Sequence, residues 1–211
     1  MAMSSDQEPK WLKWAREIQA LSQIGLAFTD NEHQRADFQR LREIAAEMIE
    51  HCSTVSKQDC LKIFSLQPGY ATAKIDVRGA ALQDGRILLV QEKKDGLWCM
   101  PGGWADVGEV PSAMVAREVE EESGLLVQPR KVVGVFDANR SAERLEFFHA
   151  YKIVFLCEIL GGTPRASLET LDAGFFSFDE LPPLSPNRTN ERHLEEVRAH
   201  SLDSGRPTVF D

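Results

Sequence analysis

The chain has 211 residues, of which 43% are hydrophobic and 27% are charged. This length and composition support one packed globular domain with a smaller appendage, and they exclude an intrinsically disordered chain. The formal net charge of −9 disfavours a general affinity for nucleic acid or for an anionic membrane surface, although bound cations can reverse the local field.

The N-terminal ten residues are polar, and no stretch approaches the roughly 20 apolar residues that span a bilayer. The cysteines form no C-x-x-C pair, which argues against a zinc site. They are Cys52, Cys60, Cys99 and Cys157. Scattered thiols in a chain without a signal peptide indicate a reducing compartment, so we expect a cytoplasmic protein with no membrane partner.

Residues 9–28 and 31–53 are expected to form two amphipathic helices. In each, apolar residues recur in steps of three and four, which places them on one helical face. These residues are Trp11, Trp14, Ile18 and Leu21 in the first helix and Phe38, Leu41, Ala45, Met48 and Cys52 in the second. Thr29 is the expected N-cap of the second helix, with Glu32 reaching back to it, and a short third helix is expected from Ser56.

A hairpin of two such helices leaves an apolar stripe that something must cover. We therefore interpret residues 1–66 as an N-terminal helical extension and favour its use as the dimerisation element of a homodimer. Folding of the hairpin onto the rest of the same chain is the alternative.

Beyond a turn-like linker at residues 67–70 the pattern changes from helices to strands. Strands are expected at residues 73–82, 86–91, 98–100, 132–136, 147–160 and 175–178, because these segments are rich in β-branched and aromatic residues. Asp84-Gly85 indicates a hairpin turn, and residues 187–200 are expected to form a last helix with Thr189 as its N-cap. Residues 67–211 are therefore expected to form a second domain, of mixed α/β or α+β class.

Three glutamates mark the expected functional site. Glu118, Glu121 and Glu122 stand at i, i+3 and i+4, so a helix presents them on one face. Three carboxylates so close would push at least one toward protonation, and a hard divalent cation such as Mg²⁺ or Mn²⁺ removes that conflict. The sequence therefore predicts a divalent-cation site.

The segments beside these glutamates suit such a site. Pro111 fits the first turn of the helix, and Gly124 fits a left-handed helix end. Before the helix, Pro101-Gly102-Gly103 forces a tight loop in which a backbone carbonyl can approach a metal closely.

Residues 103–125 as a whole resemble the Nudix box, Gly-x5-Glu-x7-Arg-Glu-U-x-Glu-Glu-x-Gly-U, where U is a bulky apolar residue. Every fixed position matches, and a chance match anywhere in the chain is on the order of one in 10⁷. The matching residues are Gly103, Glu109, Arg117, Glu118, Val119, Glu121, Glu122, Gly124 and Leu125. The resemblance implies a Nudix sheet-and-helix sandwich and a Mg²⁺- or Mn²⁺-dependent hydrolase that splits a nucleoside diphosphate linked to another group.

The same resemblance assigns roles to individual residues. Glu118, Glu121 and Glu122 would be metal ligands, with the Gly103 carbonyl as a further ligand. Arg117 would form a buried pair with Glu109 that shapes the helix and its loop, while Glu120 would face solvent.

Other catalytic roles stay open at this point. Glu121 or Glu122 could act as general base while binding metal, and the family often supplies a carboxylate from a loop outside the box. Asp137, Glu143 and Glu146 lie in the region of such a loop, and nothing separates Glu143 from Glu146.

Two arginines are candidates for substrate binding. Arg78 and Arg140 could pair with phosphate in bidentate geometry. Core packing or an ordinary surface position is the favoured interpretation for Trp98, His149, Tyr151 and Arg188.

Segments outside the box are similar to a Nudix subgroup with an N-terminal helical extension. Its members act on CDP-choline or on ADP-ribose, and the substrate expected first is CDP-choline, cleaved to CMP and phosphocholine. ADP-ribose or another nucleoside diphosphate sugar is the alternative, and a non-catalytic nucleotide-binding module is a third possibility that the complete set of box carboxylates disfavours.

Overall fold

The computed structural model describes residues 9–138 and 149–211. The chain divides into two compact units, Met1–Ala73 and Lys74–Asp211. Within the described residues no helix combines the length and the apolar character needed to cross a bilayer.

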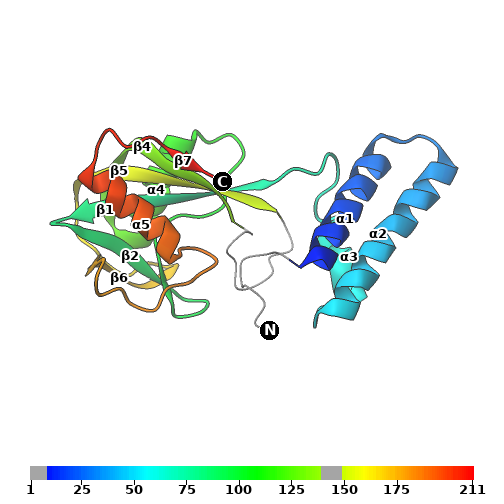
Figure 1. The fold of residues 1–211 in the computed structure, drawn as a ribbon, viewed down its shortest axis with the longest axis horizontal. Coiled ribbons are helices and arrows are strands. Elements are labelled where there is room, and N and C mark those ends of the chain that lie inside the picture. The colour runs from blue at the N-terminus through cyan, green and yellow to red at the C-terminus, as the bar shows by residue number, and fades with distance from the viewer. Residues whose placement is uncertain (1–8, 139–148) are drawn as a thin grey trace. The chain divides into compact units, whose positions relative to one another are not determined.

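The first unit is helical. It contains α1 (Lys10–Phe28), α2 (Glu32–Cys52) and α3 (Lys57–Ser65), with α1 and α2 joined by a short loop (Figure 1). The two long helices therefore confirm the predicted hairpin. Ser56 is the N-cap of α3, because its side chain accepts a hydrogen bond from the Asp59 backbone N–H.

The cap predicted for α2 was wrong. Thr29 closes α1 instead, its backbone N–H donating to Gly25 O, and Asn31 caps α2 by accepting from the backbone of His33 and Gln34. Because Thr29 is the C-cap of α1, the N-cap of α2 comes two residues later, at Asn31.

The helices of this unit bury both small and large apolar side chains, such as Leu12 and Ile49, and leave others exposed. Ala15, Ala45 and Ala46 are fully buried between them. Trp14 and Leu21, which belong to the predicted apolar stripe of α1, remain 54% and 58% exposed. The hairpin therefore leaves these two members of the stripe exposed, while Trp11 and Ile18 are partly buried.

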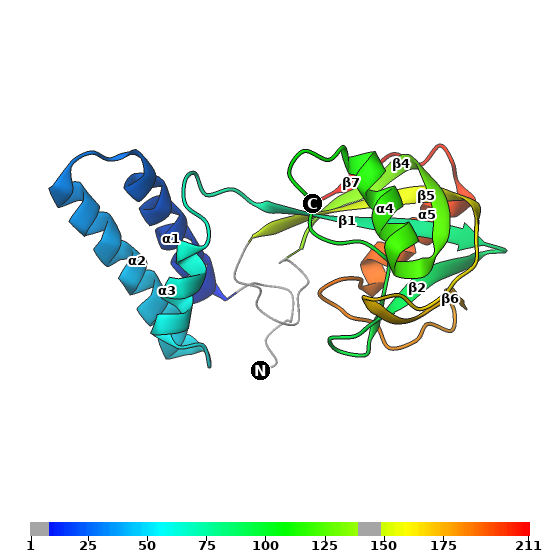
Figure 2. The ribbon, with the colours of Figure 1, turned by 180° about the vertical axis from the view of Figure 1, so that it is seen from behind.

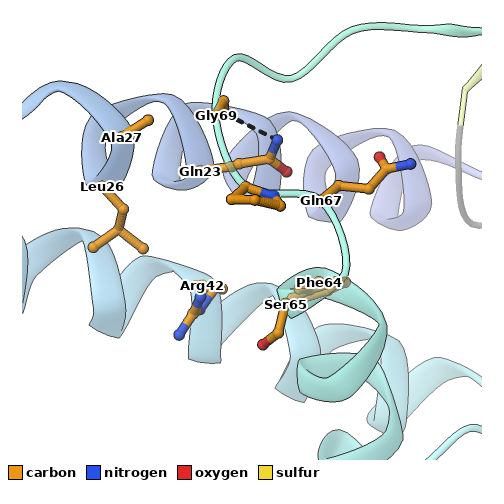
Figure 3. A pocket seen from close by; sticks show the side chains of 9 residues that line it. Gln23, Leu26, Ala27, Arg42, Phe64, Ser65, Gln67 and Gly69 are labelled. Atoms are coloured by element: carbon orange, nitrogen blue, oxygen red, sulfur yellow. Dashed lines mark hydrogen bonds between the residues drawn. The ribbon is translucent and has the colours of Figure 1, made fainter. Parts of the chain in front are cut away.

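A hollow of about 200 Å³ lies beside α3 in the same unit (Figure 3). Its lining consists of Gln23, Leu26, Ala27, Arg42, Phe64, Ser65, Gln67, Pro68 and Gly69. The Gln23 side-chain amide donates to Gly69 O at 3.0 Å. This bond holds the linker against α1, so the linker belongs structurally to the helical unit.

In the described part of the second unit, a mixed sheet of seven strands carries a helix on each face (Figures 1 and 2). The strand order is β3-β2-β1-β5-β4-β7, and β6 pairs with β2. The strands are β1 (Lys74–Gln83), β2 (Arg86–Glu92), β3 (Trp98–Cys99), β4 (Leu125–Asp137), β5 (Ala150–Gly162), β6 (Thr170–Ser177) and β7 (Val209–Phe210), and the helices are α4 (Pro111–Ser123) and α5 (Glu191–Leu202).

Most predicted elements of this unit are confirmed, although several bounds differ: β6, for example, begins at Thr170 rather than at residue 175. The turn at Asp84 and Gly85 has positive φ at both residues, +50° and +74°, as a tight hairpin requires. β4 starts at Leu125, seven residues before its predicted start, and the short β7 was not predicted. The N-cap of α5 is Asn190 rather than Thr189.

Each face of the sheet has its own core. α4 packs on one face through Met114, Val115 and Val119, against Val77 and Phe155 of the sheet. α5 packs on the other face through Leu194 and Val197. The two helices thus bury both sides of β1, which explains why that strand is buried from Asp76 to Ala81.

Candidate metal and pyrophosphate site

The loop before α4 is fixed to the edge of β1. β1 pairs with β5 along most of its length but with β2 only at Leu82 and Gln83. The free part of its edge is bonded instead by the loop: Val77 N donates to Gly103 O and Gly79 N to Pro101 O, both at 2.9 Å. Backbone hydrogen bonds therefore set the position of the loop.

Glycine is required at the centre of this loop. Gly102 has φ +139°, and a Cβ there would lie 2.0 Å from Val77 O. A Cβ on Gly103 would lie 3.2 Å from Oε2 of Glu118. The two glycines therefore let the loop pass between β1 and the glutamates of α4.

Helix α4 begins and ends where the sequence predicts. Pro111 is its first residue, and Gly124 ends it in the left-handed conformation at φ +77°. A Cβ on Gly79 of β1 would lie only 2.4 Å from Val119 Cγ2. Because Gly79 has no Cβ, α4 packs close to β1. The adjacent face of the helix carries the glutamates and faces the loop.

Glu118, Glu121 and Glu122 form a ridge of carboxylates along α4. Glu122 is the most deeply buried of the three. It is 6% exposed, and its Oε2 accepts a hydrogen bond from Gly102 N at 2.9 Å. Burial raises the pKa of Glu122 to about 7, even though Arg78 and the Gly102 N–H favour the ionised form. Burial also raises the pKa of Glu118. The protein alone therefore supplies too little positive charge for these carboxylates.

Arg117 gathers the remaining carboxylates of the site. Its guanidinium lies 2.8 Å from Glu109, 2.7 Å from Glu121 and 2.9 Å from Glu118. The predicted pair with Glu109 is present, but it is not buried, because both side chains are about one-third exposed. The physical reason is that α4 presents Arg117 beside the exposed loop 104–110 rather than to the sheet.

Comparison with known proteins agrees with this geometry. Residues 74–197 match the NUDIX domain, and residues 9–64 match a domain described as UDP-X-like, N-terminal oligomerisation domain. The chain belongs to the Nudix hydrolase family. Its Nudix helix is α4, and the predicted fold class and enzyme class are confirmed.

Relatives with curated names cover most of the chain. The Bacillus subtilis protein YjhB, whose name gives ADP-ribose pyrophosphatase as a provisional assignment, is 35% identical over 97% of this chain and 98% of its own length. An ADP-ribose pyrophosphatase of Methanocaldococcus jannaschii is 32% identical over 62% of this chain and 75% of its own length.

Two solved structures are similar to this chain, one over about two thirds of its length and the other over nearly all of it. An ADP-ribose pyrophosphatase from Streptococcus suis has a TM-score of 0.61 at 40% identity, covering 66% of this chain and all of that one. A UDP-X diphosphatase also has a TM-score of 0.61, at 29% identity, covering 99% of this chain and all of that one. The CDP-choline interpretation finds no support among these relatives.

Nudix hydrolases generally use divalent cations, and the residues around the Nudix helix fit such a group. Within the described ranges, no three His, Cys, Asp or Glu side chains already converge as a metal centre. Arg117 instead lies between Glu118 and Glu121. The carboxylates offer hard oxygen donors, which suit Mg²⁺ or Mn²⁺, and a bound cation would add to the positive charge that Arg117 and Arg78 supply.

Arg78 does not lie where a phosphate-binding residue was expected. Its side chain is 4% exposed and pairs with both oxygens of Asp76, at 2.8 and 3.1 Å. It also donates to Met100 O at 3.1 Å. Because these partners occupy its donors, Arg78 is placed to hold the glycine loop and not to meet a ligand directly.

The other candidates are only partly within the described residues. Arg140, Glu143 and Glu146 lie outside the described residues. Asp137 lies 3.3 Å from His149. Tyr151 is 42% exposed.

Core packing accounts for Trp98, which lies edge-on to Phe176 with ring centroids 4.6 Å apart. Arg188 pairs with Glu92 and Asp95.

Two carboxylates near the ridge were missed from the sequence. Burial is the main cause of the raised pKa of Glu122 and of Glu118, and the charges of Glu92 and Glu169, respectively, add smaller contributions in the same direction. Glu92 ends β2, and Glu169 precedes β6, so neither belongs to the box. Only the pairing of β2 with β6 brings them to α4, and no local pattern in the sequence signals it.

Proposed function

We propose that this chain is a Mg²⁺- or Mn²⁺-dependent pyrophosphohydrolase whose substrate is ADP-ribose or a similar nucleoside diphosphate sugar. The observation that carries the reaction class is the ridge of Glu118, Glu121 and Glu122 beside the Gly102–Gly103 loop. The substrate class is supported by the relatives, two of which are named ADP-ribose pyrophosphatases and one UDP-X diphosphatase.

In this proposal Glu118, Glu121, Glu122 and the Gly103 carbonyl would hold the cation. That carbonyl accepts a bond from Val77 N, and its second lone pair stays available. A bound divalent cation supplies an activated water and neutralises charge on the leaving phosphate. Arg117 positions Glu118 and Glu121, while the Gly102 N–H positions Glu122.

The test is a substrate panel. Hydrolysis of ADP-ribose, UDP-glucose, CDP-choline and ATP is followed in Mg²⁺ and in Mn²⁺, each with and without EDTA. We expect kcat/KM for a nucleoside diphosphate sugar to exceed that for CDP-choline and ATP by at least about tenfold, with no turnover in EDTA. Turnover that survives EDTA, or a preference for CDP-choline or ATP, contradicts the proposal.

We also propose that the first unit is a homodimerisation element. Trp14, Leu21 and Phe28 of α1 recur every seven residues and are 54%, 58% and 70% exposed, so they form one apolar stripe. The family description of residues 9–64 as an oligomerisation domain supports this interpretation.

Light scattering tests the dimer. The chain mass is 23.7 kDa, and we expect twice that mass for the native chain. The double variant Trp14→Glu, Leu21→Glu should give the monomer mass, whereas Lys13→Glu on the same helix should not. A native monomer, or an unchanged dimer in the double variant, overturns this assignment.

A further inference from the structure

An exposed tryptophan stands directly beside the glycine loop, at a position that the Nudix box leaves free. Trp104 is 50% exposed, and it follows Gly103, where an added Cβ would lie 3.2 Å from Glu118. Consecutive Cα atoms are about 3.8 Å apart, so the Trp104 backbone lies one residue step from the ridge. A large aromatic surface is therefore open to solvent next to the proposed pyrophosphate site.

The position of this residue is fixed by the strand beside it. Asp76 and Trp104 form an antiparallel bridge, and Ala105 N donates to Ile75 O at 2.8 Å. The Lys74 ammonium lies 5.7 Å from the indole centroid, at cation–π distance. The paired backbone fixes the position of Trp104, and the Lys74 ammonium lies near its ring, so the fold itself holds the indole at the surface.

A polar cluster lies on the same side of β1 as the indole. Residues paired directly across two strands share a face, so Trp104 projects to the side of Asp76. Asp76 is 7% exposed and lies between Arg78 and Lys152, whose ammonium is 3.4 Å away. These three side chains are buried and bonded to one another, so they fix the strand against which the Trp104 segment is paired.

We propose that the indole of Trp104 is the stacking wall of a nucleobase subsite. This inference rests on the proposed function, since it places the base of a nucleoside diphosphate one ribose away from the cation-bound phosphates. An indole face binds any planar base by stacking and needs no particular group at the edge of the base. The ligand class is therefore a nucleotide with an intact base.

Binding of nucleoside monophosphates tests the subsite without requiring turnover. Tryptophan fluorescence of the full-length protein is titrated in Mg²⁺ with AMP, UMP, CMP and GMP, and with ribose 5-phosphate as the ligand without a base. We compare the native chain with Trp104→Phe, Trp104→Ala and the control Val107→Ala. Val107 is fully exposed in the same loop, so the control removes apolar surface without removing a ring.

The expected pattern separates stacking from a structural effect. At least one monophosphate should quench the native fluorescence, and ribose 5-phosphate should not. Trp104→Phe should lose the quench and keep affinity within about threefold, while Trp104→Ala should weaken binding roughly 5- to 100-fold. Val107→Ala should behave as the native chain.

Three results overturn the proposal: no binding of any monophosphate, native affinity in Trp104→Ala, or a quench that persists in Trp104→Phe. Hydrolysis of the substrate panel by Trp104→Ala with unchanged KM also overturns it, yet leaves the proposed reaction intact. Conversely, Trp104-dependent binding without hydrolysis would refute the proposed reaction and keep the subsite.

Discussion

Replacing Gly102 by alanine tests whether the glycine loop sets the position of the ridge. The added methyl group would lie 2.0 Å from Val77 O and 3.0 Å from Arg78 Cα. Both are backbone atoms of a buried central strand, which cannot rotate away as a flexible side chain can. The loop itself must therefore move.

The size of that movement follows from the contact. Even a 3.0 Å separation, the shortest that real Cβ atoms show, requires a shift of about 1 Å. A shift of that size stretches the 2.9 Å bond from Gly102 N to Glu122 and moves the Gly103 carbonyl with it. Misplacement by about 1 Å can cost about 100-fold in rate, and the strained backbone should cost about 1–3 kcal/mol of stability.

The assay measures kcat with the best substrate in Mg²⁺, together with urea unfolding of the same preparations. Gly108→Ala is the matched control, because Gly108 also has positive φ, +94°, but a Cβ there meets nothing within 4 Å. We expect Gly102→Ala to lose about 100-fold in kcat and Gly108→Ala to stay within about threefold. Equal kcat for the two variants would refute the positioning role of the loop.

Three further changes probe other contacts of the site and its support. Thr189→Val leaves the buried Met100 N–H without its 2.9 Å acceptor and should lower the free energy of unfolding by about 1–3 kcal/mol; a loss below about 0.5 kcal/mol in urea unfolding would contradict this. Arg117→Gln should reduce kcat by about 10- to 100-fold with less than about 1 kcal/mol lost in stability, since its ion pairs are partly exposed; unchanged kcat would show that the arginine does not position the glutamates. Burial lowers the pKa of His193 to about 3. The unfolded chain is therefore protonated at this residue below about pH 6.5 while the folded chain is not, and the free energy of unfolding falls as the pH drops below 6.5. His193→Gln keeps a neutral side chain at this helix start and should lose about 2 kcal/mol less than the native chain between pH 7 and pH 5; parallel pH profiles of unfolding would count against this.

The local features of the site were readable from the sequence because they depend on neighbouring residues. Pro111 and Gly124 bound the Nudix helix at its observed ends. The i, i+3, i+4 spacing places the glutamates on one ridge wherever that helix packs. The Asp84-Gly85 turn is likewise a local preference of the backbone.

Features that depend on residues far apart in the chain could not be predicted from the sequence. The alternation of Asp76 and Arg78 with apolar residues in β1 suggests an exposed polar face, yet both side chains are buried, at 7% and 4% exposure. Their partner Lys152 lies on β5 and is fully buried, and burial lowers its pKa to about 8. A charge network of this kind is specified by strand pairing, so the sequence did not show that Arg78 is buried and paired with Asp76.

Competition between similar residues explains the errors in helix caps. Thr189 and Asn190 are both good N-cap residues in the sequence. Thr189 is taken by the Met100 N–H of the site, which leaves Asn190 to cap α5 with His193. The hydrogen bond between Met100 N and Thr189 therefore determines that Asn190, and not Thr189, is the N-cap of α5.

Calorimetric titration of the full-length protein with Mn²⁺ alone tests most directly whether the glutamate ridge binds cations. Glu122→Gln should weaken Mn²⁺ binding by at least about tenfold, whereas Glu120→Gln, an exposed neighbour on the same helix, should bind as the native chain does. Native Mn²⁺ affinity in Glu122→Gln would contradict the account.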